Sequence, residues 1–177
     1  QAVSAIRREE RIEQIAQQTH DPTPLEQLEK RYPVIYADPP WLYDFSKDSA
    51  DNIEEHYPTM ELDDICDMPV SEIATRDCVL FLWATSPKLK EALRVIDSWG
   101  FTYRTCAVWD KEWIGPGYYF RQRHELLLVA TRGNPPVPEP TNRPDSVYSE
   151  KRTDHSRKPA KFAEFIDVLT RRIADAQ

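Results

Sequence analysis

The stretch Pro33–Trp41, which reads PVIYADPPW, organises the rest of the chain. Its first five residues are mostly apolar and predict a short buried strand. The two prolines after Asp38 cannot donate to a sheet or continue a strand, so we expect the strand to end there. A carboxylate and an indole thus follow the end of a buried strand, where ligand sites of α/β proteins commonly lie.

A second apolar run, Cys78–Ala84, is typical of a strand covered on both faces, and we expect it at the centre of the sheet. A helix should follow it, with Pro87 near its start and Gly100 at its end. The strands expected at 101–109 and 125–130 have no helix between them and predict an antiparallel pair.

The remaining elements complete an α/β domain. The earlier strands alternate with helical segments and should be parallel, so the sheet is expected to be mixed. A polar and aromatic stretch at 42–58 is expected to be a lid. Short helices are expected near 59–65 and 69–73, a short strand at 146–148 and an amphipathic closing helix at 159–175.

The 177 residues suit one folded domain, which we place at 25–177. Residues 1–24 are predicted to form a charged helix and a linker, because isoleucines recur among charges before a proline-rich break. We expect that helix to offer a surface through which the protein can form oligomers. Three scattered cysteines, Cys66, Cys78 and Cys106, predict buried thiols in a reducing compartment.

The charge of the chain is unevenly spread, although its net value is −7. The first 75 residues hold 6 basic and 17 acidic residues, and the remainder hold 17 and 13. Basic residues in the range 121–161 form either a phosphate-attracting face or an ordinary solvated surface. Three aromatic residues at 118–120 lie next to Arg121 and Arg123, and either clamp a single strand by stacking or form an ordinary hairpin tip.

The sequence argues against several other classes of protein. No apolar run approaches the roughly 20 residues of a membrane span, so we expect a cytoplasmic protein without a membrane partner. With four glycines, the chain lacks the Gly-x-Gly-x-x-Gly string of a nucleotide loop. Its histidines and cysteines lack metal-ligand spacing, so no metal site is expected.

The corner at residues 38–41 suits chemistry on the exocyclic amine of a nucleobase. This amine is a poor nucleophile because its lone pair is delocalised into the ring. We expect the Asp38 carboxylate and the Pro39 carbonyl each to accept one N–H, which aims the lone pair at an electrophile. Pro40 helps to fix these acceptors, and an exposed Trp41 is expected to stack on a base that has left its helix.

Six segments within residues 32–168 resemble, in the same order, motifs of the MT-A70 family. They are Asp38–Trp41, His56–Met60, Phe81–Thr85, Val108–Lys111, Arg132–Pro135 and His155–Pro159. The family comprises S-adenosylmethionine-dependent adenine-N6 methyltransferases, and the chain looks most like its bacterial and phage members. The resemblance implies a Rossmann-like methyltransferase fold, with a mostly parallel sheet, an antiparallel pair and a permuted motif order.

The resemblance also implies roles for individual residues. Asp38 and Pro39 would hold the target amine, with Trp41 beside the base and Tyr57 on a gating loop near the substrate. Ser156 and Lys158, with Asp38, would face the cofactor S-adenosylmethionine, and Lys158 would lie near its carboxylate. Family members continue into a further strand and a cofactor-binding loop, so we expect a C-terminal part of the cofactor site to be missing from these residues.

The leading hypothesis is direct in-line methyl transfer to N6 of adenine in DNA, without a covalent enzyme intermediate. Arg121 and Arg123 are then expected to contact the nucleic acid. The alternatives are transfer to adenine in RNA, transfer to N4 of cytosine, and a non-catalytic nucleic-acid-binding subunit of a methyltransferase complex.

Overall fold

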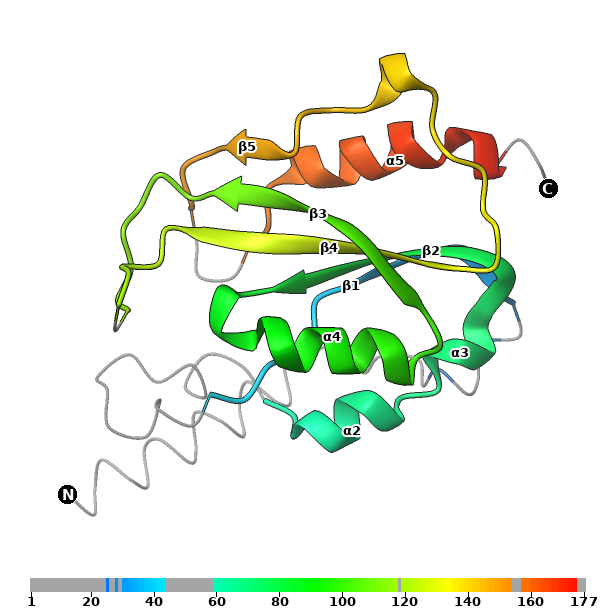
Figure 1. Ribbon diagram of the computed structural model, residues 1–177, viewed down its shortest axis with the longest axis horizontal. Coiled ribbons are helices and arrows are strands. Elements are labelled where there is room, and N and C mark those ends of the chain that lie inside the picture. Colours follow the sequence, from blue (N-terminus) through cyan, green and yellow to red (C-terminus); the bar gives the residue numbers. More distant parts are fainter. Residues whose placement is uncertain are drawn as a thin grey trace.

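The computed structural model describes residues 25, 28, 30–43, 59–117, 119–153 and 157–174. In this part of the chain, helices cover both faces of a five-stranded sheet (Figure 1). The predicted N-terminal helix and most of the predicted lid fall outside the described residues. Among the predicted site residues, so do Tyr57 and Ser156.

The sheet is mixed, as the sequence predicts. Its strands are β1 (Tyr32–Ala37), β2 (Ala74–Ala84), β3 (Thr102–Asp110), β4 (His124–Arg132) and β5 (Val147–Ser149). Their order is β1-β2-β4-β3-β5, and β4 runs antiparallel to both neighbours while the outer pairs are parallel. The apolar run in β2 lies inside the sheet, but the middle position expected for it belongs to β4.

The helices form two layers. They are α2 (Leu62–Asp67), α3 (Val70–Ile73), α4 (Leu89–Ser98) and α5 (Ala160–Ala174), with short 3-10 turns η4 (Ser86–Lys88) and η5 (Pro140–Asn142). Residues of α2, α3 and α4 pack on one face of the sheet, and α5 covers the other (Figure 1). The predicted α/β fold with a mixed sheet is confirmed.

The alternation of side chains along β2 divides the core between these layers. Cys78, Leu80 and Leu82 point to the α4 face, whereas Phe81 and Trp83 point to the α5 face, where they meet Phe162. All seven residues from Cys78 to Ala84 are buried, which explains the unbroken apolar run. Of the three cysteines, only Cys78 is buried. The expectation of buried thiols is wrong for Cys66 and Cys106, which are half-buried.

One edge of the sheet collects the ends of four strands. The carboxyl ends of β1, β2 and β3 meet the amino end of β4, because β4 is antiparallel to its neighbours. Asp38 directly follows β1, Thr85 follows β2, and His124 begins β4. Polar groups distant in sequence are therefore brought together at this edge.

We expect Gly133→Ala to destabilise the fold by about 2–4 kcal/mol. Gly133 follows β4 with a φ of 65°, and a Cβ there would collide with the Asp77 carboxylate and the Arg76 carbonyl oxygen. Gly100 is a matched control, since its φ is 79° but no atom lies near an added Cβ. Gly100→Ala should cost about 1–2 kcal/mol from its backbone conformation alone. Equal losses in urea unfolding would contradict the predicted collision.

Candidate active site

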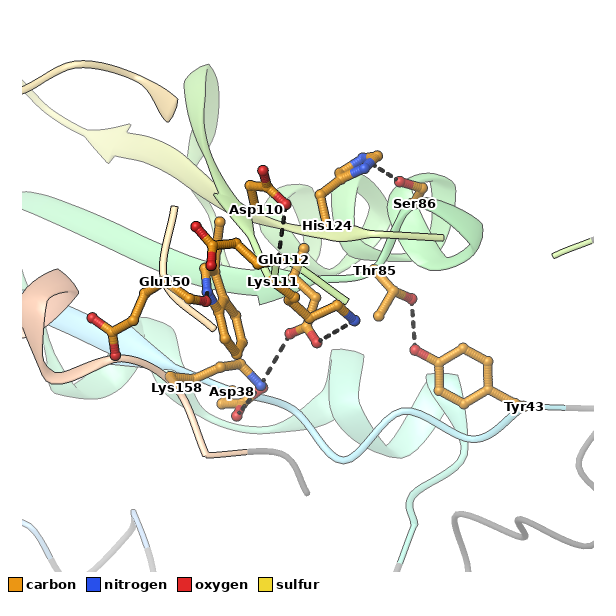
Figure 2. A network of polar contacts seen from close by, with 12 residues as sticks. Asp38, Tyr43, Thr85, Ser86, Asp110, Lys111, Glu112, His124, Glu150 and Lys158 are labelled. Carbon is orange, nitrogen blue, oxygen red and sulfur yellow. Dashed lines mark hydrogen bonds and ion pairs between the residues drawn. The ribbon is translucent and has the colours of Figure 1, made fainter. Parts of the chain in front are cut away.

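Four charged side chains form a chain of ion pairs at this edge (Figure 2). Lys158 Nζ lies 2.8 Å from Oδ2 of Asp38 and 3.3 Å from Oε2 of Glu125. The other oxygen of Glu125 lies 3.3 Å from Nζ of Lys111. The two negative and the two positive side chains thus balance each other's charge in a site that is partly shielded from water. The structure brings together Asp38 and Lys158, which the sequence places 120 residues apart.

The Asp38 carboxylate stands at the open end of this network. Its side chain is 46% exposed, compared with 15% for both Lys158 and Glu125. Burial by the surrounding protein nevertheless raises the pKa of Asp38, and the Lys158 ammonium only partly opposes this effect. Burial alone would lower the pKa of Lys158, but its pairing with Glu125 and Asp38 outweighs burial and raises it. Lys158 therefore stays charged beside Asp38.

Backbone hydrogen bonds fix the two prolines. The Pro39 carbonyl accepts the Trp41 N–H at 2.9 Å, which closes a tight turn directly after Asp38. The Pro40 carbonyl accepts the Met60 N–H at 2.9 Å and ties the corner to the segment before α2. Because the prolines also restrict φ, the carbonyl of Pro39 is held in one direction next to the Asp38 carboxylate.

The expectation of an exposed Trp41 is wrong. Its side chain is only 7% exposed and belongs to the core on the α4 face. The indole Nε1 donates to the Trp83 carbonyl at 3.1 Å, so the polar edge of the ring is satisfied inside the protein. The large apolar ring gains more from burial than from exposure at the corner. In this conformation Trp41 anchors the corner to β2 rather than offering a stacking surface.

Because Trp41 is buried, its replacement should destabilise the fold. Trp41→Ala should lower the free energy of unfolding by about 3–5 kcal/mol, because it leaves a large cavity. Trp41→Phe should cost about 1 kcal/mol or somewhat more, since it keeps most of the packing and leaves the Trp83 carbonyl without its donor. Chemical denaturation measures both losses. An alanine variant as stable as the wild type would show that the indole is not part of the core.

Two further contacts hold the loops around Asp38. The Tyr43 hydroxyl lies 2.6 Å from the Thr85 hydroxyl, and burial raises the pKa of Tyr43 to about 12. Ser86 Oγ lies 2.9 Å from Nε2 of His124 (Figure 2). Tyr43 therefore stays neutral and ties the segment after the corner to the end of β2. His124 ties the start of β4 to the same place.

The two predicted substrate arginines lie on the β3–β4 connection and not in the ion-pair network. Arg123 binds Asp110 with both arms of its guanidinium, through Nε at 2.6 Å and Nη2 at 2.8 Å. This pairing lowers the pKa of Asp110 to about 2. Arg121 is exposed and makes no polar contact among the described residues. Arg123 thus fixes the base of the connection through Asp110.

Sequence reasoning missed Glu125 and Lys111 as members of the site. The sequence predicts Glu125 to lie in an apolar strand, although it is a charged residue at the start of an otherwise mostly apolar segment. That contrast is a usable signal, because the start of an antiparallel strand lies at the same edge as the ends of its parallel neighbours. Trp83 and Trp109 are buried, at 1% and 3% exposure.

Other kinds of site find no support in the part of the chain that the structure describes. There, no group of three or more His, Cys, Asp or Glu side chains is arranged to hold a metal ion. Within the same residues, none of the helices has the length and apolar character needed to cross a membrane. The candidate site is the charged edge around Asp38, where the ion-pair network lies.

Comparison with known proteins identifies the family. The model of the MT-A70 family matches residues 32–175, which is most of the chain. The chain belongs to the MT-A70 family. The MT-A70 match includes every described member of the ion-pair network, from Asp38 to Lys158.

Three relatives carry names relevant to this MT-A70 protein. The Type II methyltransferase M.MunI of Mycoplasma sp is 34% identical, over 73% of this chain and 64% of that protein. A probable N(6)-adenosine-methyltransferase MT-A70-like of Oryza sativa subsp. japonica is 27% identical, over 80% of this chain and 20% of that protein. An Arabidopsis thaliana protein named N(6)-adenosine-methyltransferase MT-A70-like is 26% identical, over 77% and 19%. The chain thus matches 64% of the bacterial relative and about a fifth of each plant relative.

Proposed function

We propose that the protein is an S-adenosylmethionine-dependent methyltransferase that modifies N6 of adenine in DNA. The observation that carries this proposal is the open Asp38 carboxylate, paired with Lys158 and directly followed by the fixed Pro39 carbonyl. Membership of the MT-A70 family and the names of the relatives support a methyl transfer to adenine.

Asp38 and Pro39 are proposed to hold the adenine amine by its two hydrogens. Lys158 faces Oδ2 of Asp38, and Oδ1 has no hydrogen-bond partner among the described residues. The Pro39 carbonyl accepts from Trp41 and, like any carbonyl, has a second lone pair. Two acceptors on one amine draw its lone pair out of conjugation with the ring and direct it at the methyl donor.

The same carboxylate suits the proton that the amine must lose. Methyl transfer would break the S–CH₃ bond of the sulfonium, leaving a neutral thioether, and form the N–CH₃ bond, which leaves one N–H proton in excess on the adenine nitrogen. Asp38, whose pKa is raised by burial, is a stronger base than an ordinary aspartate. It accepts this proton and later releases it to water, so no covalent bond to the enzyme is formed.

The charges of the site fit S-adenosylmethionine, which supplies a methyl group on a positively charged sulfonium and also carries a carboxylate. Lys158 is proposed to hold that carboxylate, because it stays ionised and is fixed by Glu125 and Asp38. Asp38 adds a negative charge that favours the sulfonium. Ser156, in the same segment as Lys158, is a further proposed cofactor contact, and Tyr57 a proposed substrate contact.

DNA is proposed as the polymer because the bacterial relative resembles this chain more than the plant relatives do. Adenine in RNA is the second candidate, since both plant relatives are named N(6)-adenosine-methyltransferases. An assay of the full-length protein with labelled cofactor on DNA and RNA oligonucleotides of matched sequence separates them. Nucleoside mass spectrometry should find N6-methyldeoxyadenosine. Label only in RNA would overturn the choice of polymer, and label in cytosine the choice of base.

A further inference from the structure

The connection between β3 and β4 presents an exposed apolar tip, formed by Trp113, Ile114, Tyr119 and Phe120. Tyr119 is 97% exposed and Phe120 83%, the highest values among the large apolar side chains of the described residues. Trp113 and Ile114 are 42% and 47% exposed. Large apolar groups gathered in this way on a surface commonly mark a binding site, because their exposure to water is unfavourable.

The backbone of this aromatic tip is held in a defined shape. Gly115 N–H donates to the Gln122 carbonyl at 2.7 Å, and Gln122 N–H donates back to the Pro116 carbonyl at 3.1 Å. At Gly117 a Cβ would collide with the Phe120 carbonyl oxygen, so the tight turn requires glycine. These hydrogen bonds fix the base of the aromatic tip on either side of Tyr119 and Phe120.

The surroundings of the aromatic tip are basic. Arg152 stacks over the Trp113 ring at 4.1 Å, and the exposed Arg121 directly follows Phe120 in the sequence. Residues 110–112, 121–123 and 150–152 together hold five basic and three acidic side chains. Asp110 and Arg123 neutralise each other, which leaves four basic and two acidic side chains. Arginines interleaved with aromatic rings suit a polyanion whose bases stack, which is the chemistry of a single-stranded nucleic acid.

The aromatic tip rises from the same edge of the sheet as Asp38. Lys111 leads from β3 into the tip and pairs with Glu125, which pairs with Lys158, which pairs with Asp38. Figure 1 shows the β3–β4 connection extending beyond this edge of the sheet. A strand whose adenine reaches Asp38 can therefore extend along the tip.

We propose that the aromatic tip is a stacking platform for unpaired nucleotides that flank the target adenine. The inference rests on the proposed function of the Asp38 site. It adds that the substrate is unpaired where it lies against the aromatic tip. Stacking requires exposed base faces, so the platform favours single-stranded over duplex DNA. The basic side chains favour this occupant over a protein partner or a second copy of the chain, which the test includes as contrary outcomes.

The test measures binding of the full-length protein to a fluorescein-labelled single-stranded DNA oligonucleotide by anisotropy, over a range of salt concentrations. The double variant Tyr119→Ala/Phe120→Ala should weaken binding about 10- to 100-fold with little change in the salt dependence. Arg121→Gln should reduce the slope of log K against log salt by about one, the change expected when one phosphate contact is lost. Tyr119→Phe/Phe120→Tyr should bind like the wild type. Val137→Ala is a control, as this exposed residue lies far from the tip in sequence.

Unchanged binding of the double variant would overturn the platform, as would an equal loss of binding to the fully paired duplex. A change in sedimentation of the protein alone, with normal DNA binding, would show instead that the tip contacts protein. Both rings are exposed, so thermal unfolding should be unaffected and serves as a check on folding. Methyl transfer is measured in a separate assay. If the wild-type protein transferred no methyl group but the tip variants still weakened DNA binding, the proposed function would be refuted and the stacking platform would stand.

Discussion

Asp38→Ala is expected to reduce methyl transfer by at least about 10³-fold while leaving the fold intact. The variant removes one of the two proposed acceptors for the adenine amine and the base for its proton. Because the Asp38 side chain is 46% exposed and contributes no apolar packing, its removal should change stability little. Single-turnover methylation rates and thermal unfolding measure the two effects.

A matched control separates this effect from general loss of charge. Asp63→Ala removes a carboxylate that is 77% exposed and pairs with Arg94 on the surface. That variant should methylate at the wild-type rate, since exposed ion pairs contribute little to stability. If Asp38→Ala retained the rate of the Asp63 variant, Asp38 would not hold the reacting amine.

Lys158→Met is expected to raise the dissociation constant of S-adenosylmethionine about 10- to 100-fold. The variant removes a charge-assisted hydrogen bond to the cofactor carboxylate, worth about 1.5–3 kcal/mol. Lys161→Met is the control, because this lysine pairs with Glu164 on the exposed side of α5. Calorimetric titration of the full-length protein measures the constant. If Lys158→Met bound S-adenosylmethionine as tightly as Lys161→Met does, Lys158 would interact with Asp38 but not with the cofactor carboxylate.

The ion-pair network also predicts opposite pH effects for two of its members. The rate of methyl transfer should fall as the pH drops through the pKa of Asp38, because the protonated carboxyl group cannot act as the base. Lys158 lowers this pKa, so Lys158→Met should move the acid limb of the pH–rate profile to higher pH. Glu125 raises it, so Glu125→Gln should move the limb to lower pH. Shifts in the same direction would show that the limb reports another group.

The sequence was informative where one physical cause dominated. The apolar run Cys78–Ala84 could only be satisfied by burial on both faces, and the lack of a helix between β3 and β4 required them to be antiparallel. Asp38 was recognisable because the prolines after it end β1. The MT-A70 resemblance then connected it with Lys158, and the structure places the two side chains in contact.

Other features depended on packing that sequence spacing does not encode. Trp41 follows two prolines and a carboxylate, a context that suggests exposure, yet the ring fits the core and its N–H finds the Trp83 carbonyl. Glu125 enters the site only because β4 inserts between β2 and β3 in the opposite direction. Strand order is a property of the whole sheet, so the complete charge network could not be derived from single segments.

Asp38 and the Pro39 carbonyl are proposed together to hold the amine that is methylated. The direct measurement is a crystal structure of the full-length protein with an unreactive cofactor analogue and an adenine oligonucleotide. We expect adenine N6 within about 2.7–3.2 Å of both the Asp38 carboxylate and the Pro39 carbonyl oxygen. An ordered adenine whose N6 contacts neither acceptor, with Asp38 still bound only to Lys158, would contradict the account.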